Sequence, residues 1–89
     1  MNYEKIVSDI IAPLIVNKDS LLIKSMPGLN ENELTIHIIA ESDDIARLIG
    51  RGGQMADNIR EAVNVAGKIE NKRVHVKFES YSDNKSSDE

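Results

Sequence analysis

The sequence predicts an α+β domain in which three helices cover one face of a three-stranded mixed sheet. Three observations predict it. Apolar residues recur at spacings of three and four in three segments, apolar and polar residues alternate in other segments, and 89 residues suffice for one modest core. With 29% charged residues and no long apolar run, the sequence excludes a transmembrane helix. We expect one domain over residues 1–79, in the order α-β-β-α-α-β.

A helix and a hairpin are predicted in the first half of the chain. Apolar residues follow helical spacing from Tyr3 to Leu14, and Pro13 should loosen the final turn, so that the helix ends before residue 17. Two strands follow over residues 20–26 and 33–40, separated by a polar turn that begins at Pro27 and Gly28. We expect these strands to pair as an antiparallel hairpin.

Residues 42–67 are predicted to form two helices joined by a glycine turn. Asp43 and Asp44 fall in the first turn of the shorter helix, where the helix dipole favours negative charge. The longer helix should stop at Gly67. The side chains of the shorter helix that we expect to face the core are those of Ile45, Ala46, Leu48 and Ile49.

The third strand is predicted over residues 73–79, with Val74, Val76 and Phe78 facing inward. The two-helix excursion before it is long enough for a crossover, which allows this strand to run parallel to the second one. Residues 80–89 are acidic and almost free of apolar side chains, so we expect a disordered tail.

Composition excludes several kinds of chemistry. The chain has no cysteine, which removes disulfides, thiolate catalysis and cysteine-based metal sites. His37 and His75 fall at outward strand positions, and no motif adds a nucleophile or a third ligand, so we expect neither an enzyme nor a metal or cofactor site. The N-terminus lacks the basic start of an export signal, and we expect a cytoplasmic protein without a membrane partner.

The glycine turn Gly50-Arg51-Gly52-Gly53 is the most informative segment. Three glycines in four residues exceed what a helix–helix turn needs. A backbone without side chains, followed by the positive start of a helix, suits a phosphate group, and Arg51 and Arg47 add mobile charge. A plain helix–helix turn with a surface arginine remains the alternative. A nucleotide P-loop is excluded, because Gln54 and Met55 follow the last glycine and a helix precedes the first.

Charge is distributed unevenly along the chain. The net charge of −4 argues at first against a polyanionic partner. However, residues 1–46 carry three basic and eight acidic side chains, whereas residues 47–78 carry seven basic and three acidic ones. The positive segment contains the glycine turn, so the average does not exclude RNA.

The element order, together with Ile49 and the glycine turn, resembles the type II KH domain, whose hallmark is an I-G-x-x-G loop. More narrowly, the IAPLI end of the first helix and the stretch DIARLIGRGGQMADNIREAV resemble the small single-domain bacterial KH proteins called KhpA. The resemblance covers about residues 3–79. It implies a single-stranded RNA-binding protein whose glycine turn clamps the backbone of about four nucleotides.

The resemblance also implies a shallow groove for the bases, with one wall from the two helices and the other from a strand. Helix-side candidates are Ile45, Ile49, Met55 and Ile59, and strand-side candidates are Ile38 and Ile39. The pattern favours burial of Ile49, Ile59 and Ile38. The complete set of RNA-binding candidates is Arg47, Ile49, Gly50, Arg51, Gly52, Gly53, Gln54, Asn58 and Ile38.

Two positions depart from the family pattern. Relatives often carry basic residues just after the loop and about three positions later, where this chain has Gln54 and Asp57. Asp57 stabilises the start of its helix but repels phosphate, so we expect modest affinity. Gln54 and Asn58 either hydrogen-bond to RNA or form an ordinary solvated surface.

The KhpA resemblance further implies an RNA chaperone or post-transcriptional regulator, a homodimer, a larger KH-containing partner of the Jag/KhpB type, and a role in cell shape and cell wall homeostasis. The open sheet face with Thr35, His37, Ile39 and His75 is a candidate dimer surface. Two alternatives remain: a KH-fold protein interaction module with weak or lost RNA binding, and a single-stranded DNA binder.

Overall fold

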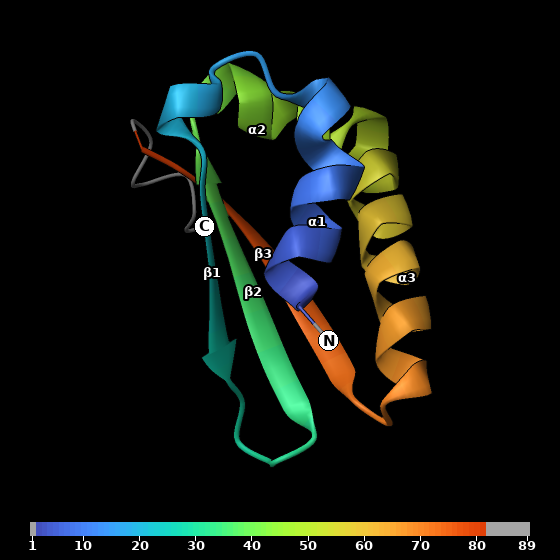
Figure 1. Ribbon diagram of the computed structural model, residues 1–89. Helices are drawn as coiled ribbons and strands as arrows, with labels where there is room; N and C mark the ends of the chain where they lie inside the picture. The colour runs from blue at the N-terminus through green and yellow to red at the C-terminus, as the bar shows by residue number, and fades with distance from the viewer. Residues whose placement is uncertain (1, 82–89) are drawn as a thin grey trace.

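The computed structural model describes residues 2–81 and has the element order that the sequence predicts (Figure 1). Three short 3₁₀ turns accompany the main elements, at Ala12–Leu14, Lys18–Ser20 and Arg51–Gly53. The helices and strands are α1 (Tyr3–Ile11), β1 (Leu22–Pro27), β2 (Glu33–Ala40), α2 (Ser42–Ile49), α3 (Gln54–Ile69) and β3 (Arg73–Ser80).

The three strands form one mixed sheet in the order β1-β2-β3. β1 runs antiparallel to β2, and β3 runs parallel to β2, as expected. Figure 1 shows α1 and α3 side by side against one face of the sheet, with α2 across one end. This arrangement confirms the predicted α+β class and agrees with a KH domain.

The core lies between the sheet and the helices, and the alternation of the strands determines which side chains reach it. From β2, Ile36, Ile38 and Ala40 are buried, and from β3, Val74 and Val76 are buried. The helices contribute Val7, Ile11, Ile45, Leu48, Ile59 and Val63. Ala46 and Ile49, which we expected to face inward, are exposed because α2 buries only one narrow side.

The segment between α1 and β1 contains two 3₁₀ turns. α1 ends at Ile11, and Pro13 lies in the first of these turns, which confirms the predicted loosening. β1 begins at Leu22, two residues later than expected. The second turn accounts for the delay, because the Ser20 amide donates to the Asn17 carbonyl and the Leu21 amide donates to the Lys18 carbonyl.

The prediction that α3 stops at Gly67 is wrong. Gly67 is buried inside the helix, which continues to Ile69. Beyond the end of α3, the chain reverses at Asn71, whose φ is 57°. A Cβ atom on Gly67 would lie 2.6 Å from the Lys72 carbonyl oxygen, and the Lys72 amide donates to the Gly67 carbonyl at 2.8 Å. This glycine therefore permits a close backbone approach where the chain turns into β3.

At the C-terminal end, β3 extends one residue beyond the expected boundary. Ser80 belongs to the strand, and the Tyr81 amide donates to the Ala40 carbonyl at 3.2 Å. The rest of the expected tail, residues 82–89, lies outside the described residues. Over residues 2–81, no helix has the length and apolar character needed to cross a membrane.

Candidate nucleic-acid interface

The glycine turn joins α2 to α3 at the end of the molecule where α2 lies (Figure 1). Its three glycines, Gly50, Gly52 and Gly53, have φ angles of 74°, 65° and 79°. A Cβ atom on Gly50 would also lie 2.6 Å from the Met55 Cβ. The turn itself therefore uses every glycine, contrary to our expectation that one would suffice, and the glycine count alone does not indicate a ligand.

The accessibility of the turn is more informative than its composition. A Cβ atom added to Gly52 or Gly53 would meet no atom within 4 Å. Within residues 2–81, no hydrogen bond reaches the amides of Arg51 and Gly52, and the exposed Arg51 side chain has no partner. Open amides, a mobile guanidinium and the positive start of α3 together form a surface suited to an anion.

Arg47, expected to be mobile, is held in place. Its Nε donates to the Leu14 carbonyl at 3.1 Å, and its Nη2 donates to the Asp44 carboxylate. Asp44 is fully buried and also accepts the amides of Val16 and Asn17, each at 3.0 Å. The Val16 amide first, and then Arg47 and Asn17, hold the pKa of this carboxyl well below its ordinary value. Arg47 thus joins α2 to the segment after α1.

The aliphatic candidates for base contact differ from the expectation in which side chains are buried and which are exposed. Ile59 and Ile38 are buried, as expected, and Ile45 is also buried, so their side chains offer almost no surface to a base. Ile49 was expected to be buried, but 37% of it is exposed beside the glycine turn. Met55 is half-buried and packs against the core. Ile49 is therefore the most accessible of these residues.

The strand wall beside the helices belongs to β3, not to β2. β2 is the central strand, and its Ile39 pairs with Leu22 and Glu79 on the face away from the helices. A groove of ≈ 480 Å³ instead runs between α3 and β3. Its lining residues are Arg60, Asn64, Arg73, Val74, His75, Val76 and Lys77.

Two side chains of α3 bind the free edge of β3. Asn64 accepts the Val74 amide at 3.0 Å and donates to the Val74 carbonyl at 2.8 Å, and Arg60 Nε donates to the Val76 carbonyl at 3.3 Å. The peptide groups of Val74 therefore point away from β2, and those of Val76 and Phe78 do the same because a strand alternates. We did not predict Arg60 or Asn64. One feature of the sequence could have indicated them: the third strand follows a crossover, so it can form an edge of the sheet and lie beside the second helix of the crossover.

Gln54 and Asn58 are exposed but do not line this groove. Asn58 precedes Arg60 by two residues, which places the two side chains about 200° apart around the helix axis. Asp57 lies on the groove side, and its carboxylate accepts a hydrogen bond from Arg60 Nη1 at 3.3 Å. The acid that we expected to repel phosphate thus has a cationic partner.

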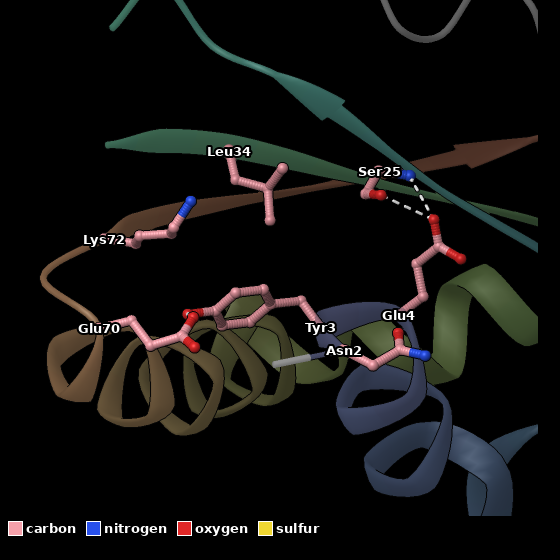
Figure 2. A pocket seen from close by; sticks show the side chains of 7 residues that line it. All are labelled: Asn2, Tyr3, Glu4, Ser25, Leu34, Glu70 and Lys72. Carbon is pink, nitrogen blue, oxygen red and sulfur yellow. Dashed lines mark hydrogen bonds between the residues drawn. The ribbon is translucent and has the colours of Figure 1, made fainter. Parts of the chain in front are cut away.

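A larger hollow of ≈ 970 Å³ lies near the N-terminus of α1, at the opposite end from the glycine turn (Figure 2). The Tyr3 hydroxyl donates to Glu70 at 2.7 Å, and Glu4 accepts the amide and hydroxyl of Ser25 at 3.0 and 2.7 Å. Burial and then Glu70 raise the pKa of Tyr3 to about 12, and the same hydrogen bond lowers the pKa of Glu70. These contacts attach α1 to α3 and β1, so we assign this hollow a structural role.

The histidines lie on the open sheet face, where His37 pairs with Lys77 and His75 with Thr35. His37 Nδ1 lies 3.1 Å from a Glu79 carboxylate oxygen. Among the described residues, no three His, Cys, Asp or Glu side chains gather into a group that could hold a metal ion.

Comparison with known proteins agrees with the fold. The KH domain described as KhpA/KhpB matches residues 4–78. The curated relatives include proteins named RNA-binding protein KhpA from Listeria monocytogenes and Listeria innocua, each 26% identical over 75 residues, or 84% of this chain and 96% of the relative. No solved structure gives a significant match. Because the family match covers most of the chain, the protein belongs to the KhpA/KhpB KH-domain family.

Proposed function

We propose that this protein binds single-stranded RNA and holds its sugar–phosphate backbone at the turn from Gly50 to Gly53. One observation carries the proposal: the amides of Arg51 and Gly52 have no partner within residues 2–81, and both residues are exposed beside the start of α3. The proposal is also supported by family membership and by the relatives named RNA-binding proteins.

The proposed mechanism divides the work between backbone and side chains. Amides of the turn donate to phosphate oxygens, and Arg51 provides a mobile charge that pairs with the same groups. Ile49 offers an aliphatic surface to a base beside the turn, since 37% of it is exposed. Arg47 is paired with the ionised Asp44 carboxylate, so its role in this mechanism is to hold α2 in place beside the turn. Phosphate contacts of this kind give affinity with little sequence discrimination.

Two substitutions at Gly52 test the clamp. Asp and Asn have nearly the same size and tolerate positive φ better than most residues, and the position has free space. Gly52→Asp adds a negative charge beside the phosphate, and we expect it to weaken binding at least about tenfold, equivalent to about 1.4 kcal/mol. Gly52→Asn adds a neutral side chain of nearly the same size, so it is the matched control for the charge and should weaken binding less than Gly52→Asp does. Fluorescence anisotropy with a short labelled RNA measures both affinities.

Wild-type affinity in Gly52→Asp would contradict the clamp. A titration at two salt concentrations adds a second criterion, because a clamp on a few phosphates requires that affinity fall with salt. The matching DNA oligonucleotide tests the single-stranded DNA alternative, since backbone clamping does not by itself detect the 2′-hydroxyl. Absence of binding to either oligonucleotide would favour the protein interaction module.

For the cellular role, we propose a cytoplasmic RNA chaperone or post-transcriptional regulator that influences cell shape and cell wall homeostasis. The support is the family match and the small size of the domain, which fits a protein that contacts few nucleotides. A homodimer and a larger KH-containing partner of the Jag/KhpB type complete this proposal. A second bound domain would extend the contacted RNA and offset the modest affinity of one clamp.

For the partner surface, the outer side of α3 is a better candidate than the open sheet face. Val65 and Ile69 are 58% and 75% exposed there, and Ala62 is also exposed. Spacings of three and four place these side chains in one stripe along the helix. Of the residues that we first considered on the sheet, Thr35, His37 and Ile39 are only half-exposed, and His75 is exposed but polar. We therefore propose that protein partners pack on the stripe of Ala62, Val65 and Ile69.

A further inference from the structure

The guanidinium group of Arg60 is held at the edge of the groove by three neighbours. Its Nε donates to the Val76 carbonyl at 3.3 Å, and its Nη1 donates to Asp57 at 3.3 Å. Its central carbon lies over the Phe78 ring, 5.4 Å from the ring centroid. An exposed arginine ordinarily samples many rotamers, so these contacts reduce the entropy that it would lose on binding a ligand.

Part of this group remains available to a ligand. The Arg60 side chain is 45% exposed, and only two of its five N–H donors have partners among residues 2–81. The guanidinium carbon lies over the Phe78 ring, and the exposed part of the group is open to another flat group. Nucleobases stack on guanidinium planes as well as on aromatic rings.

The position of Arg60 fits an RNA strand that is bound at the glycine turn. Arg60 follows Gly53 by seven residues, so it lies on nearly the same side of α3 and about 10 Å further along the helix axis. The free edge of β3 forms the opposite wall of this groove, and Asn64 closes that edge at Val74. An RNA strand that leaves the glycine turn along the groove therefore reaches Arg60 before it reaches the part of the groove that Asn64 closes.

We propose that Arg60 and Phe78 form a stacking site for one nucleobase, in which the base lies on the exposed part of the Arg60 guanidinium. This inference rests on the proposed RNA binding and names a base contact that the aliphatic groove does not supply. A base is favoured over a phosphate because Asp57 already neutralises part of the Arg60 charge and would itself repel a phosphate at that point. Asp57 becomes a positioning residue that orients the guanidinium plane.

The test uses two variants of the full chain and a short single-stranded RNA in which one abasic position is moved along the sequence. Arg60→Lys keeps the charge and removes the plane, and Arg60→Ala removes both. We expect each variant to bind intact RNA roughly 5- to 100-fold more weakly than the wild type, the range typical of one lost base stack. With the abasic position in the matching register, wild type and Arg60→Ala should bind equally.

Three outcomes would overturn the stacking site. One is wild-type affinity in Arg60→Lys, which would mean that charge alone matters. Another is an abasic RNA that loses affinity equally in wild type and Arg60→Ala, because the two changes would then act independently. The third is a salt slope that falls by about one in Arg60→Ala, the result for a lost phosphate contact. Circular dichroism confirms that both variants are folded before binding is compared.

The Gly52 pair separates failure of this inference from failure of RNA binding. If Gly52→Asp weakens binding, and does so more than Gly52→Asn, the clamp is supported whatever the Arg60 variants show. Unaltered affinity in the Arg60 variants would then count against the stacking site alone. If Gly52→Asp binds RNA as the wild type does, the clamp fails, and the stacking site fails with it.

Discussion

At the scale of single residues, the carboxylate of Asp44 connects α2 to the segment that follows α1. It accepts hydrogen bonds from the amides of Val16 and Asn17 and from Arg47, although it is buried. Burying a carboxylate is costly unless such donors satisfy it. Because Arg47 lies three residues before the glycine turn, this network also fixes the orientation of α2 at the candidate interface.

The Asp44 network predicts a specific response to acid. The pKa of Asp44 is lowered in the folded protein, whereas in the unfolded chain it should be about 4. The stabilisation is therefore complete above about pH 4 and is lost as the pH falls below that value toward the depressed folded pKa. We expect Asp44→Asn to lower the thermal midpoint at pH 7 and to flatten its dependence on pH between 5 and 3. If the thermal midpoints of the wild type and Asp44→Asn fell by the same amount between pH 5 and pH 3, this role would be contradicted.

Residue identity predicted some of the candidate site and missed other parts for physical reasons. Arg51 and the glycines could be found because their chemistry is encoded locally in four consecutive residues. Arg60 and Asn64 resemble ordinary solvated positions on a helix, and only their contacts with β3 make them part of the groove. The exposure of Ile49 depends on how α2 packs, which an apolar pattern over eight residues does not determine.

At the scale of elements, alternation and helical spacing predicted the types and order of the helices and strands. Their ends depended on tertiary contacts. α3 continues beyond Gly67 because this glycine does not adopt a left-handed conformation; it leaves room for the Lys72 backbone to approach closely. β3 is the edge strand beside α3, so the groove between helix and sheet is lined by β3 and not by the expected β2. Strand order follows from how the crossover packs, which residue periodicity does not specify.

The outer stripe of α3 gives the prediction at this scale. Val65→Lys places an ammonium group in the proposed dimer contact. We expect the proposed homodimer to dissociate at least about tenfold more readily, since burying an unpaired charge costs more than about 1.4 kcal/mol. Thr35→Lys is the matched control on the open sheet face and should leave the dimer intact. Sedimentation velocity over a range of concentrations measures both. Dissociation in Thr35→Lys with an intact Val65→Lys dimer would assign the contact to the sheet.

At the scale of the whole molecule, the glycine turn and the contacts that attach α1 lie at opposite ends. Residues 47–78 carry most of the basic side chains, and they build the glycine turn, α3 and most of β3. The other end holds the contacts of Tyr3 with Glu70 and of Glu4 with Ser25, which attach α1 to the rest of the fold (Figure 2). An overall charge of −4 is therefore compatible with a local surface that attracts RNA.

The most direct test of this account is a nuclear magnetic resonance titration of the labelled protein with short single-stranded RNA. The account predicts that the largest changes in amide chemical shift occur at Arg51, Gly52 and Gly53 and continue to Val76 and Phe78 along the free edge of β3. Changes restricted to the open sheet face or to the outer side of α3, with the glycine turn unaffected, would contradict it.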